Sequence, residues 1–138
     1  MAHQFEVVVR STDVDMLGHV NNAKYLEYME WARFDWIIQA GLTWEELRRR
    51  QILPVVASIQ INYRKELRML DKVTILSKPV RIGGKSFVLR QEIYKESGEL
   101  ACDADFTMVM IDAAARKATV LPEDLVAALR EGQEHPAP

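Results

Sequence analysis

Residues 11–30, STDVDMLGHVNNAKYLEYME, place two carboxylates and a histidine just ahead of a predicted helix. The carboxylates are Asp13 and Asp15, and the histidine is His19. Backbone N–H groups in the first turn of a helix lack internal partners and carry the positive end of the helix dipole, so they can stabilise charge on a carbonyl oxygen. A carboxylate just upstream can attack the carbonyl carbon or activate water for attack. These parts suffice for cleaving a thioester, whose thiolate leaves without a strong general acid.

The same residues also have structural interpretations. Asp is favoured in turns, so Asp13 is explained equally well by hydrogen bonds to loop amides. Asn21 or Asn22 is expected to cap the helix. His19, taken alone, is expected to be a buried, hydrogen-bonded histidine. For these residues, local chemistry leaves the structural and the functional interpretation open.

A calcium-binding loop fits the first part of this segment and fails in the second. Asp13, Asp15 and Gly18 match the first, third and sixth positions of such a loop. The fifth and twelfth positions would be Leu17 and Lys24, and neither supplies the required oxygen. We therefore do not expect calcium at this loop.

Other reactive groups are also unsupported. A transition-metal site at this loop is not expected, because the other histidines, His3 and His135, lie far away in the sequence. No Gly-x-Ser-x-Gly motif provides a serine nucleophile. Cys102 is the single cysteine, lies within a predicted strand and is expected to be a small core residue. One cysteine excludes an internal disulfide and is typical of a reducing, cytoplasmic setting. We expect neither a metal nor a cofactor.

The elements that position the loop follow from the spacing of apolar residues. A strand is predicted over residues 5–10, and a long helix over residues 22–40 that Gly41 ends. The helix has one wide apolar face and further apolar residues elsewhere on its circumference, so a sheet or a partner chain is expected to surround it. The first set is Tyr25, Met29, Ala32, Trp36 and Ala40, and the second is Tyr28, Trp31, Phe34 and Ile38.

The rest of the chain predicts a short helix, four strands and a last helix. Residues 43–51 begin with the capping-box spacing of Thr43 and Glu46, and Pro122 begins the last helix. Alternating residues and glycine turns favour a run of antiparallel strands, so we expect an α+β fold whose sheet curls around the central helix. The strands are predicted over residues 55–63, 72–80, 85–94 and 100–111. A single domain is expected over residues 1–131, with residues 132–138 as a frayed tail.

Composition limits the partners. The 138 residues are 49% hydrophobic and 28% charged, which is typical of a globular domain, and the formal net charge of −2 provides no basic field for nucleic acid. No apolar run approaches the roughly 20 residues that span a bilayer, and residues 1–10 do not resemble a signal peptide. We expect a cytoplasmic protein with neither nucleic-acid nor membrane partners.

The string DVDMLGHVNN at residues 13–22, followed by Tyr25 and Glu27, resembles the 4-hydroxybenzoyl-CoA thioesterase group of hotdog-fold acyl-CoA hydrolases. HVNNAKYLE is most similar to the bacterial long-chain acyl-CoA thioesterase branch of that group, and the later INYRKEL and GKS fit as well. The resemblance implies a five- or six-stranded antiparallel sheet around a long helix. It also implies homodimers, often homotetramers, with acyl-CoA bound at the dimer interface.

The resemblance also assigns site residues. It implies Asp15 as the catalytic carboxylate, a backbone N–H on or next to Asn22 as the oxyanion donor, and His19 near the carbonyl. Basic side chains are implied for the CoA phosphates, a hydroxyl for the pantetheine arm and apolar residues for an acyl tunnel, although core packing is an alternative for the apolar set. The basic candidates are Arg64, Lys65, Arg81 and Lys85, and the hydroxyl candidate is Ser86. The tunnel candidates are Tyr25, Val55 and Val56, with Tyr28 and Trp31 as further ones. The sequence departs from many relatives at Ser11, where they carry Tyr or Phe.

Two other functions stay open beside acyl-CoA hydrolysis by Asp15. One is hydrolysis of acyl groups carried by acyl carrier protein, and the other is a non-catalytic acyl-CoA-binding module on the same fold. A pure binding module does not need a carboxylate beside a reactive carbonyl, which favours an enzyme. The sequence does not distinguish Asp15 as nucleophile from Asp15 as general base.

Overall fold

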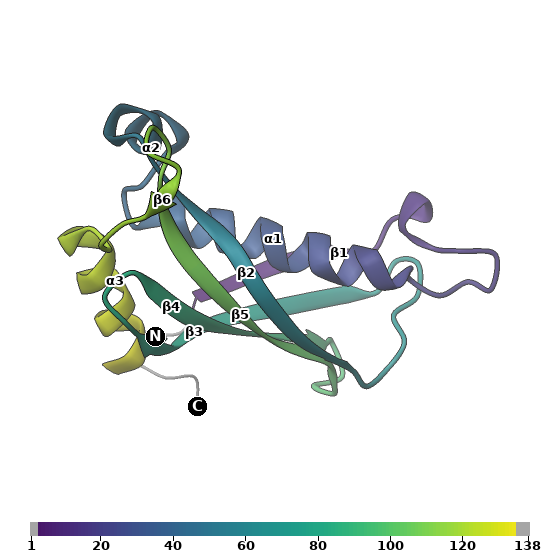
Figure 1. Ribbon diagram of the computed structural model, residues 1–138. Coiled ribbons are helices and arrows are strands. Elements are labelled where there is room, and N and C mark those ends of the chain that lie inside the picture. The colour runs from purple at the N-terminus through teal and green to yellow at the C-terminus, as the bar shows by residue number, and fades with distance from the viewer. Residues whose placement is uncertain (1–2, 135–138) are drawn as a thin grey trace.

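The computed structural model describes residues 3–134, in which an antiparallel sheet curls around one long helix, α1 (Figure 1). This arrangement confirms the expected α+β hotdog fold. The sheet order is β1-β3-β4-β5-β2, with the short β6 paired to β5. The strands are β1 His3–Val8, β2 Ile52–Tyr63, β3 Lys72–Ile82, β4 Ser86–Lys95, β5 Leu100–Asp112 and β6 Lys117–Ala118. The helices are α1 Asn22–Gln39, α2 Trp44–Arg50 and α3 Glu123–Glu134, and a 3-10 turn, η1, covers Ser11–Asp13.

Local signals fix both ends of α1. The Asn21 side chain accepts a hydrogen bond from Ala23 N at 2.9 Å, so Asn21 is the N-cap. Gly41 takes a φ of +95°, a left-handed conformation that favours glycine, and the helix ends just before it. The side of α1 that faces the sheet buries Tyr28, Met29 and other residues completely. Trp31 and Ile38 lie on the other side and are exposed.

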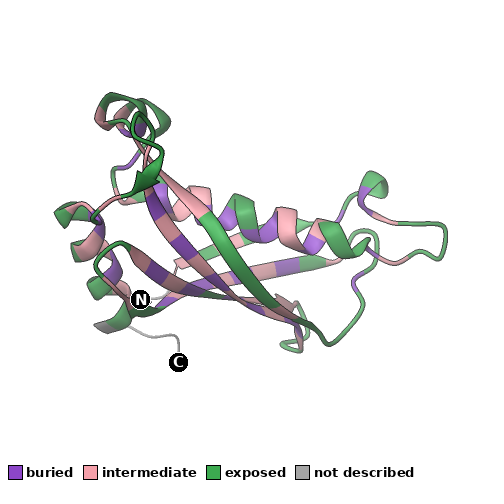
Figure 2. Ribbon diagram, in the orientation of Figure 1, coloured by how far each residue is buried: buried purple, intermediate pink, exposed green. Residues whose placement is uncertain are grey.

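The core lies between α1 and the strands β3, β4 and β5. Figure 2 shows buried bands alternating with half-buried ones along these strands, as a sheet with one covered face requires. Cys102 is fully buried on β5, which confirms its expected role as a small core residue. Strand β2 is different, because most of its residues from Val56 onward are exposed.

A bulge in β2 changes which residues face α1. The pairing of β2 with β5 shifts between Val56 and Ser58, so Ala57 is an extra residue. Val56 is paired with the buried Met108, and Ile59 is paired with the buried Phe106, so Val56 and Ile59 share the inner face. Strict alternation predicts Val55 on the face of Ile59, and that prediction is wrong.

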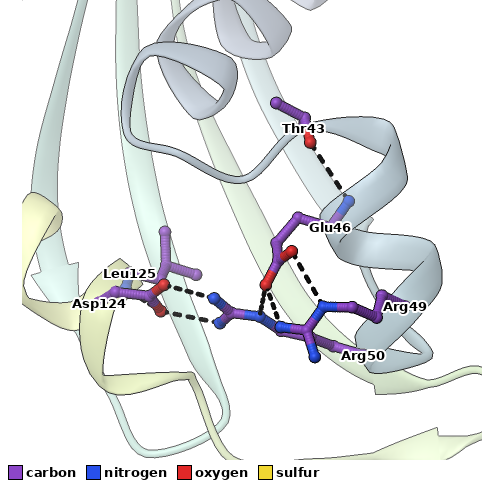
Figure 3. A network of polar contacts seen from close by, with 6 residues as sticks. All are labelled: Thr43, Glu46, Arg49, Arg50, Asp124 and Leu125. Carbon is purple, nitrogen blue, oxygen red and sulfur yellow. Dashed lines mark hydrogen bonds and ion pairs between the residues drawn. The ribbon is translucent and has the colours of Figure 1, made fainter.

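Helices α2 and α3 are joined by charged side chains. Thr43 accepts a hydrogen bond from Glu46 N at 3.2 Å, which confirms the predicted cap of α2. Arg50 of α2 makes two hydrogen bonds to Asp124 of α3, at 3.1 and 2.8 Å, and a third to Glu46 at 2.8 Å (Figure 3). These side chains are between 26% and 46% exposed and remain in contact with solvent, so the network orients the helices more than it stabilises them.

Helix α3 continues to Glu134, into the segment expected to fray. Gly132 packs so closely against Pro79 of β3 that an added Cβ would lie 2.8 Å from the proline ring. Residues 135–138 lie outside the described residues, and for them the frayed tail stays a prediction. No helix within residues 3–134 is long and apolar enough to span a membrane.

Candidate active site

A cavity of about 280 Å³ opens at the N-terminal end of α1. The three residues expected to be catalytic, Asp15, His19 and Asn22, all line it. The other lining residues are Val20, Tyr25, Tyr63, Arg64, Lys65 and Glu66. A larger cavity of about 470 Å³ lies beside the C-terminal part of α1, but it includes no residue that sequence spacing assigned to chemistry. The smaller cavity is therefore the candidate active site.

The loop before α1 folds into a tight hairpin that presents Asp15. Asp15 N donates to His19 O at 2.9 Å, and Gly18 N donates to Asp15 O at 3.0 Å. Gly18 has a φ of +83°, which residues with side chains rarely adopt, so glycine permits this turn. The hairpin projects from the body of the protein next to the segment 64–71, to which His19 and Arg68 connect it by a β-bridge (Figure 1).

The Asp15 carboxylate is held by one oxygen only. Its Oδ1 accepts hydrogen bonds from Leu17 N at 2.9 Å and His19 N at 3.3 Å. Among residues 3–134, no group donates a hydrogen bond to Oδ2. The side chain is therefore oriented by its own turn and keeps one oxygen available for a reactant.

Asp13, two residues earlier, has a structural role. It is only 6% exposed, and its Oδ2 accepts hydrogen bonds from the Tyr28 hydroxyl at 2.7 Å and from Arg10 N at 3.1 Å. Its backbone carbonyl also accepts from Asn21 N at 3.0 Å, next to the helix start. Burial, reinforced by the hydrogen bond to Asp13, raises the pKa of Tyr28 well above its usual range. The turn interpretation of Asp13 is therefore confirmed.

His19 is not buried, so that expectation is wrong. Its side chain is 40% exposed, and its Nε2 lies 2.7 Å from Glu66 Oε2. The hairpin carries His19 to the rim of the cavity, where the facing segment supplies its carboxylate partner. Glu66 was not a candidate from sequence, because 47 positions separate it from His19 and only the fold brings the two together.

The first turn of α1 leaves one backbone N–H without an acceptor in the described residues. Ala23 N and Lys24 N both donate to Asn21, at its side chain and its carbonyl. Asn22 N has no acceptor among residues 3–134, and Asn22 lines the cavity. Because free N–H groups at a helix start attract negative charge, Asn22 N–H is suited to a carbonyl oxygen.

Two tyrosines fasten the facing segment to α1. The Tyr25 hydroxyl donates to Lys65 O at 3.3 Å and accepts from Leu67 N at 3.2 Å. Tyr25 is nearly fully buried, burial raises its pKa, and its ring meets Tyr63 edge-on at 5.1 Å between centroids. Tyr63 in turn donates to Asn22 O at 3.1 Å. Tyr25 thus forms a fixed wall of the cavity, and Tyr63, absent from the sequence candidates, holds the helix start.

The basic candidates separate into two groups. Arg64 and Lys65 line the cavity, with Arg64 paired to Asp103 at 2.5 Å. Arg81, Lys85 and Ser86 lie at the β3–β4 hairpin and do not line it. The structure therefore brings two of the five polar CoA candidates to Asp15 within one chain.

The tunnel candidates on β2 also separate. Val56 lines a different cavity of about 130 Å³, between α1 and the strands β2 and β5. Val55 pairs with Val109 on the opposite face of the sheet, because of the bulge at Ala57. Val55 lines neither the candidate active site nor this second cavity.

The geometry defines the chemistry of the site. A carboxylate with one free oxygen and a free helix N-terminal N–H share one cavity, which suits attack on an activated acyl carbon. Within residues 3–134, no group of three His, Cys, Asp or Glu side chains is placed to hold a metal ion. The fold is a hotdog fold, and this cavity is its candidate site for thioester hydrolysis.

Comparison with known proteins gives the same class. The sequence profile of the Thioesterase-like superfamily matches residues 9–129, and the chain belongs to this superfamily. It is 37% identical over 123 residues to the long-chain acyl-CoA thioesterase FadM of Escherichia coli K12, covering 88% of this chain and 92% of FadM. The crystal structure of YbaW from Escherichia coli is also 37% identical, with a TM-score of 0.79 and 96% of each chain covered.

A more distant structure supports the fold alone. SAV2348 from Staphylococcus aureus, solved in complex with CoA, superposes with a TM-score of 0.94 at 19% identity. The superposition covers 100% of this chain and 88% of SAV2348. The expected family, the hotdog fold and the thioester-hydrolysing class are thus confirmed.

Proposed function

We propose that the protein hydrolyses acyl-CoA thioesters to free CoA and a carboxylic acid. The observation that carries this proposal is the pair of unoccupied groups in one cavity, Asp15 Oδ2 and Asn22 N–H. FadM, with 37% identity over most of the chain, is named a long-chain acyl-CoA thioesterase, and this supports the same reaction here.

In the proposed reaction, the thioester carbonyl oxygen accepts a hydrogen bond from Asn22 N–H. Asp15 then attacks the carbonyl carbon, forming an acyl–aspartyl anhydride that water hydrolyses, or it takes a proton from a water molecule that attacks directly. In both routes negative charge develops on the carbonyl oxygen, and the helix N-terminus stabilises it. The CoA thiolate leaves without a general acid.

The remaining cavity residues are proposed to position the substrate. His19, held by Glu66, lies at the rim and keeps the thioester against Asn22. Arg64 and Lys65 supply positive charge for the phosphates of CoA. The inner face of β2 continues from Tyr63 through Ile61 and Ile59 to Val56, an apolar path suited to an acyl chain.

We also propose that two copies pair through β2. This strand bonds to β5 on one side only, and over residues 3–134 its other edge has no partner. Val56 and Ile59 on β2 and Trp31 on α1 are all at least 40% exposed, and a second copy would cover them. Arg81, Lys85 and Ser86, which do not reach the cavity of their own chain, would then serve the CoA of the second copy, and such dimers would pair further into tetramers.

The setting follows from the proposed substrate. Acyl-CoA hydrolysis places the protein in lipid metabolism, and a single, fully buried cysteine fits the reducing cytoplasm.

The test is release of free thiol from a panel of purified acyl-CoAs of increasing chain length. The wild type is expected to hydrolyse at least one member, with the preferred length naming the substrate class. Asp15→Ala is expected to fold and to lose the activity, whereas Arg130→Met, at an exposed arginine of α3, is expected to keep it. If the wild type hydrolyses no CoA ester but releases free thiol from esters of acyl carrier protein, the substrate is acyl carrier protein and not CoA.

A further inference from the structure

A positive charge is buried beneath the middle of α1. Arg33 is only 8% exposed, and its guanidinium carbon lies 4.1 Å from the centroid of the Phe106 ring. Its Nη1 donates to Gln91 Oε1 at 3.0 Å. Burial lowers its pKa to about 10. A buried charge normally has a carboxylate partner, but among residues 3–134 no carboxylate forms an ion pair with Arg33.

Neighbouring side chains hold Arg33 in one orientation. Gln91 Nε2 donates to Met29 O and to Ser77 Oγ, both at 2.9 Å, so the Gln91 carbonyl must face Arg33. The other guanidinium N–H groups have no partner among residues 3–134. Within this range, the only fully buried side-chain polar atom without a hydrogen bond is His3 Nδ1. The unpaired N–H groups of Arg33 are therefore not fully buried. They are therefore open to a ligand.

The space beside Arg33 is the cavity of about 130 Å³, roughly the volume of four water-sized groups. Phe34, Val56 and Met108 form apolar walls. Glu30, three residues earlier on α1, is exposed and also lines this cavity. A donor-only side chain and an acceptor-only side chain thus both line a small, mostly apolar space.

This cavity lies in line with the candidate active site. Eleven residues of α1 separate Asn22 from Arg33, which is about 16 Å along the helix. Along β2, the inner face runs from Tyr63 to Val56 over about 20 Å. An acyl chain that starts at Asn22 and follows this face would bring its far end to Arg33.

We propose that Arg33 and Glu30 form a specificity site for a hydroxyl group at the far end of the acyl chain. A hydroxyl oxygen accepts from the Arg33 guanidinium while its O–H donates to the Glu30 carboxylate. A methyl end would cover these donors without pairing them, and sites that hydrogen-bond a substrate hydroxyl reject analogues without it. A carboxylate end would pair with Arg33 but be repelled by Glu30. This inference rests on the proposed thioesterase function.

The experiment compares three acyl-CoAs of equal chain length, with a methyl, a hydroxyl or a carboxylate at the far end, over a series of lengths. The wild type is expected to show a kcat/KM for the hydroxyl form at least about tenfold above the methyl form at one best length. The carboxylate form is expected below the hydroxyl form. Each preference is a ratio measured within one protein preparation, so partial unfolding of a variant does not change it.

Three variants test the two side chains separately. Arg33→Met is expected to bring the hydroxyl-to-methyl ratio to about 1, and Arg33→Lys, which keeps a charged donor, is expected to retain part of it. Glu30→Gln is expected to raise the carboxylate form relative to the hydroxyl form, because repulsion is removed. Arg130→Met is the matched control and should leave all ratios unchanged.

The failures are distinguishable. If the wild type hydrolyses the methyl forms but shows no hydroxyl preference at any length, the specificity site is wrong and the proposed function stands. The specificity site is equally wrong if Arg33→Met keeps the preference. If no CoA ester is hydrolysed, the proposed function fails and the specificity site fails with it.

Discussion

The two halves of the loop before α1 each carry an aspartate, and the two carboxylates have opposite environments. In the inner half, Asp13 is buried, and the Tyr28 hydroxyl and Arg10 N both donate to its carboxylate. In the outer half, Asp15 is exposed, and only turn amides hold one of its oxygens. Burial and hydrogen-bond partners thus give the two carboxylates different environments, and in the proposed mechanism only Asp15 reacts.

Under the proposed function, stability and reactivity belong to separate carboxylates of this loop. The Asp13 carboxylate accepts a hydrogen bond from the Tyr28 hydroxyl of α1, and its backbone carbonyl accepts one from Asn21 N. Asp13 thus anchors α1 to the loop. The hairpin that carries Asp15 is then free to be exposed. Substitutions in the inner half should therefore change the free energy of unfolding, and those in the outer half should change the rate.

Beside substitution of Asp15 itself, the largest effect is expected from removing one backbone donor in the outer half. Asn22 is the first residue of α1, where proline is tolerated because its missing N–H has no helical partner. Asn22→Pro is expected to lower kcat by about 10² to 10³, the usual loss of an oxyanion donor, with the melting temperature little changed. Asn22→Ala keeps the N–H and should stay within a few-fold of wild type in the same assay. Equal activity of the two variants would show that Asn22 N–H is not the oxyanion donor.

In the inner half, Asp13→Ala is expected to destabilise the fold. It leaves the buried Tyr28 hydroxyl and Arg10 N without their acceptor, which costs about 3 kcal/mol. Urea unfolding measures the loss. An unchanged midpoint would show that the buried carboxylate does not anchor α1.

A smaller loss of stability is expected for Tyr28→Phe, about 2 kcal/mol, because one hydrogen bond to a charged group is lost. The pKa of Tyr28 is raised from 10.0 in the fold, so its contribution to stability is present below pH 10 and lost as the pH rises above it. Unfolding followed between pH 9 and pH 11 should show a steeper decline in wild type than in Tyr28→Phe. Parallel declines would contradict the coupling.

The smallest effect is expected at the rim of the outer half. Glu66→Gln removes the charge that faces His19 across an exposed pair, so kcat/KM should fall about twofold to fivefold with stability unchanged. Glu45→Gln, at an exposed residue of α2, is the matched control. A loss comparable to that of Asn22→Pro would instead place Glu66 in the chemistry.

Sequence predicted what short-range chemistry determines. The cap of α2 by Thr43, the end of α1 at Gly41 and the hairpin turns all depend on residues a few positions apart, and all are observed. The three motif residues Asp15, His19 and Asn22 line one cavity, since one loop and one helix start carry them, and their catalytic roles stay a prediction.

The wrong or missing predictions have long-range causes. The bulge at Ala57, where β2 gains one residue over β5, inverted the prediction for Val55. His19 meets Glu66 only because the hairpin pairs with a segment of the chain far along the sequence. Arg33 was overlooked because charged residues on a helix are normally exposed, and its burial depends on Gln91 from β4.

The most direct test of the division between the two carboxylates is to measure kcat/KM and the melting temperature for Asp13→Asn and Asp15→Asn on the preferred acyl-CoA. Activity is compared at a temperature where both variants are folded. Asp15→Asn is predicted to lose about 10³-fold in kcat/KM with an unchanged melting temperature, and Asp13→Asn to lose melting temperature with far less activity lost. Full activity in Asp15→Asn, or the larger rate loss in Asp13→Asn, would contradict the assignment of Asp15 as the reactive carboxylate.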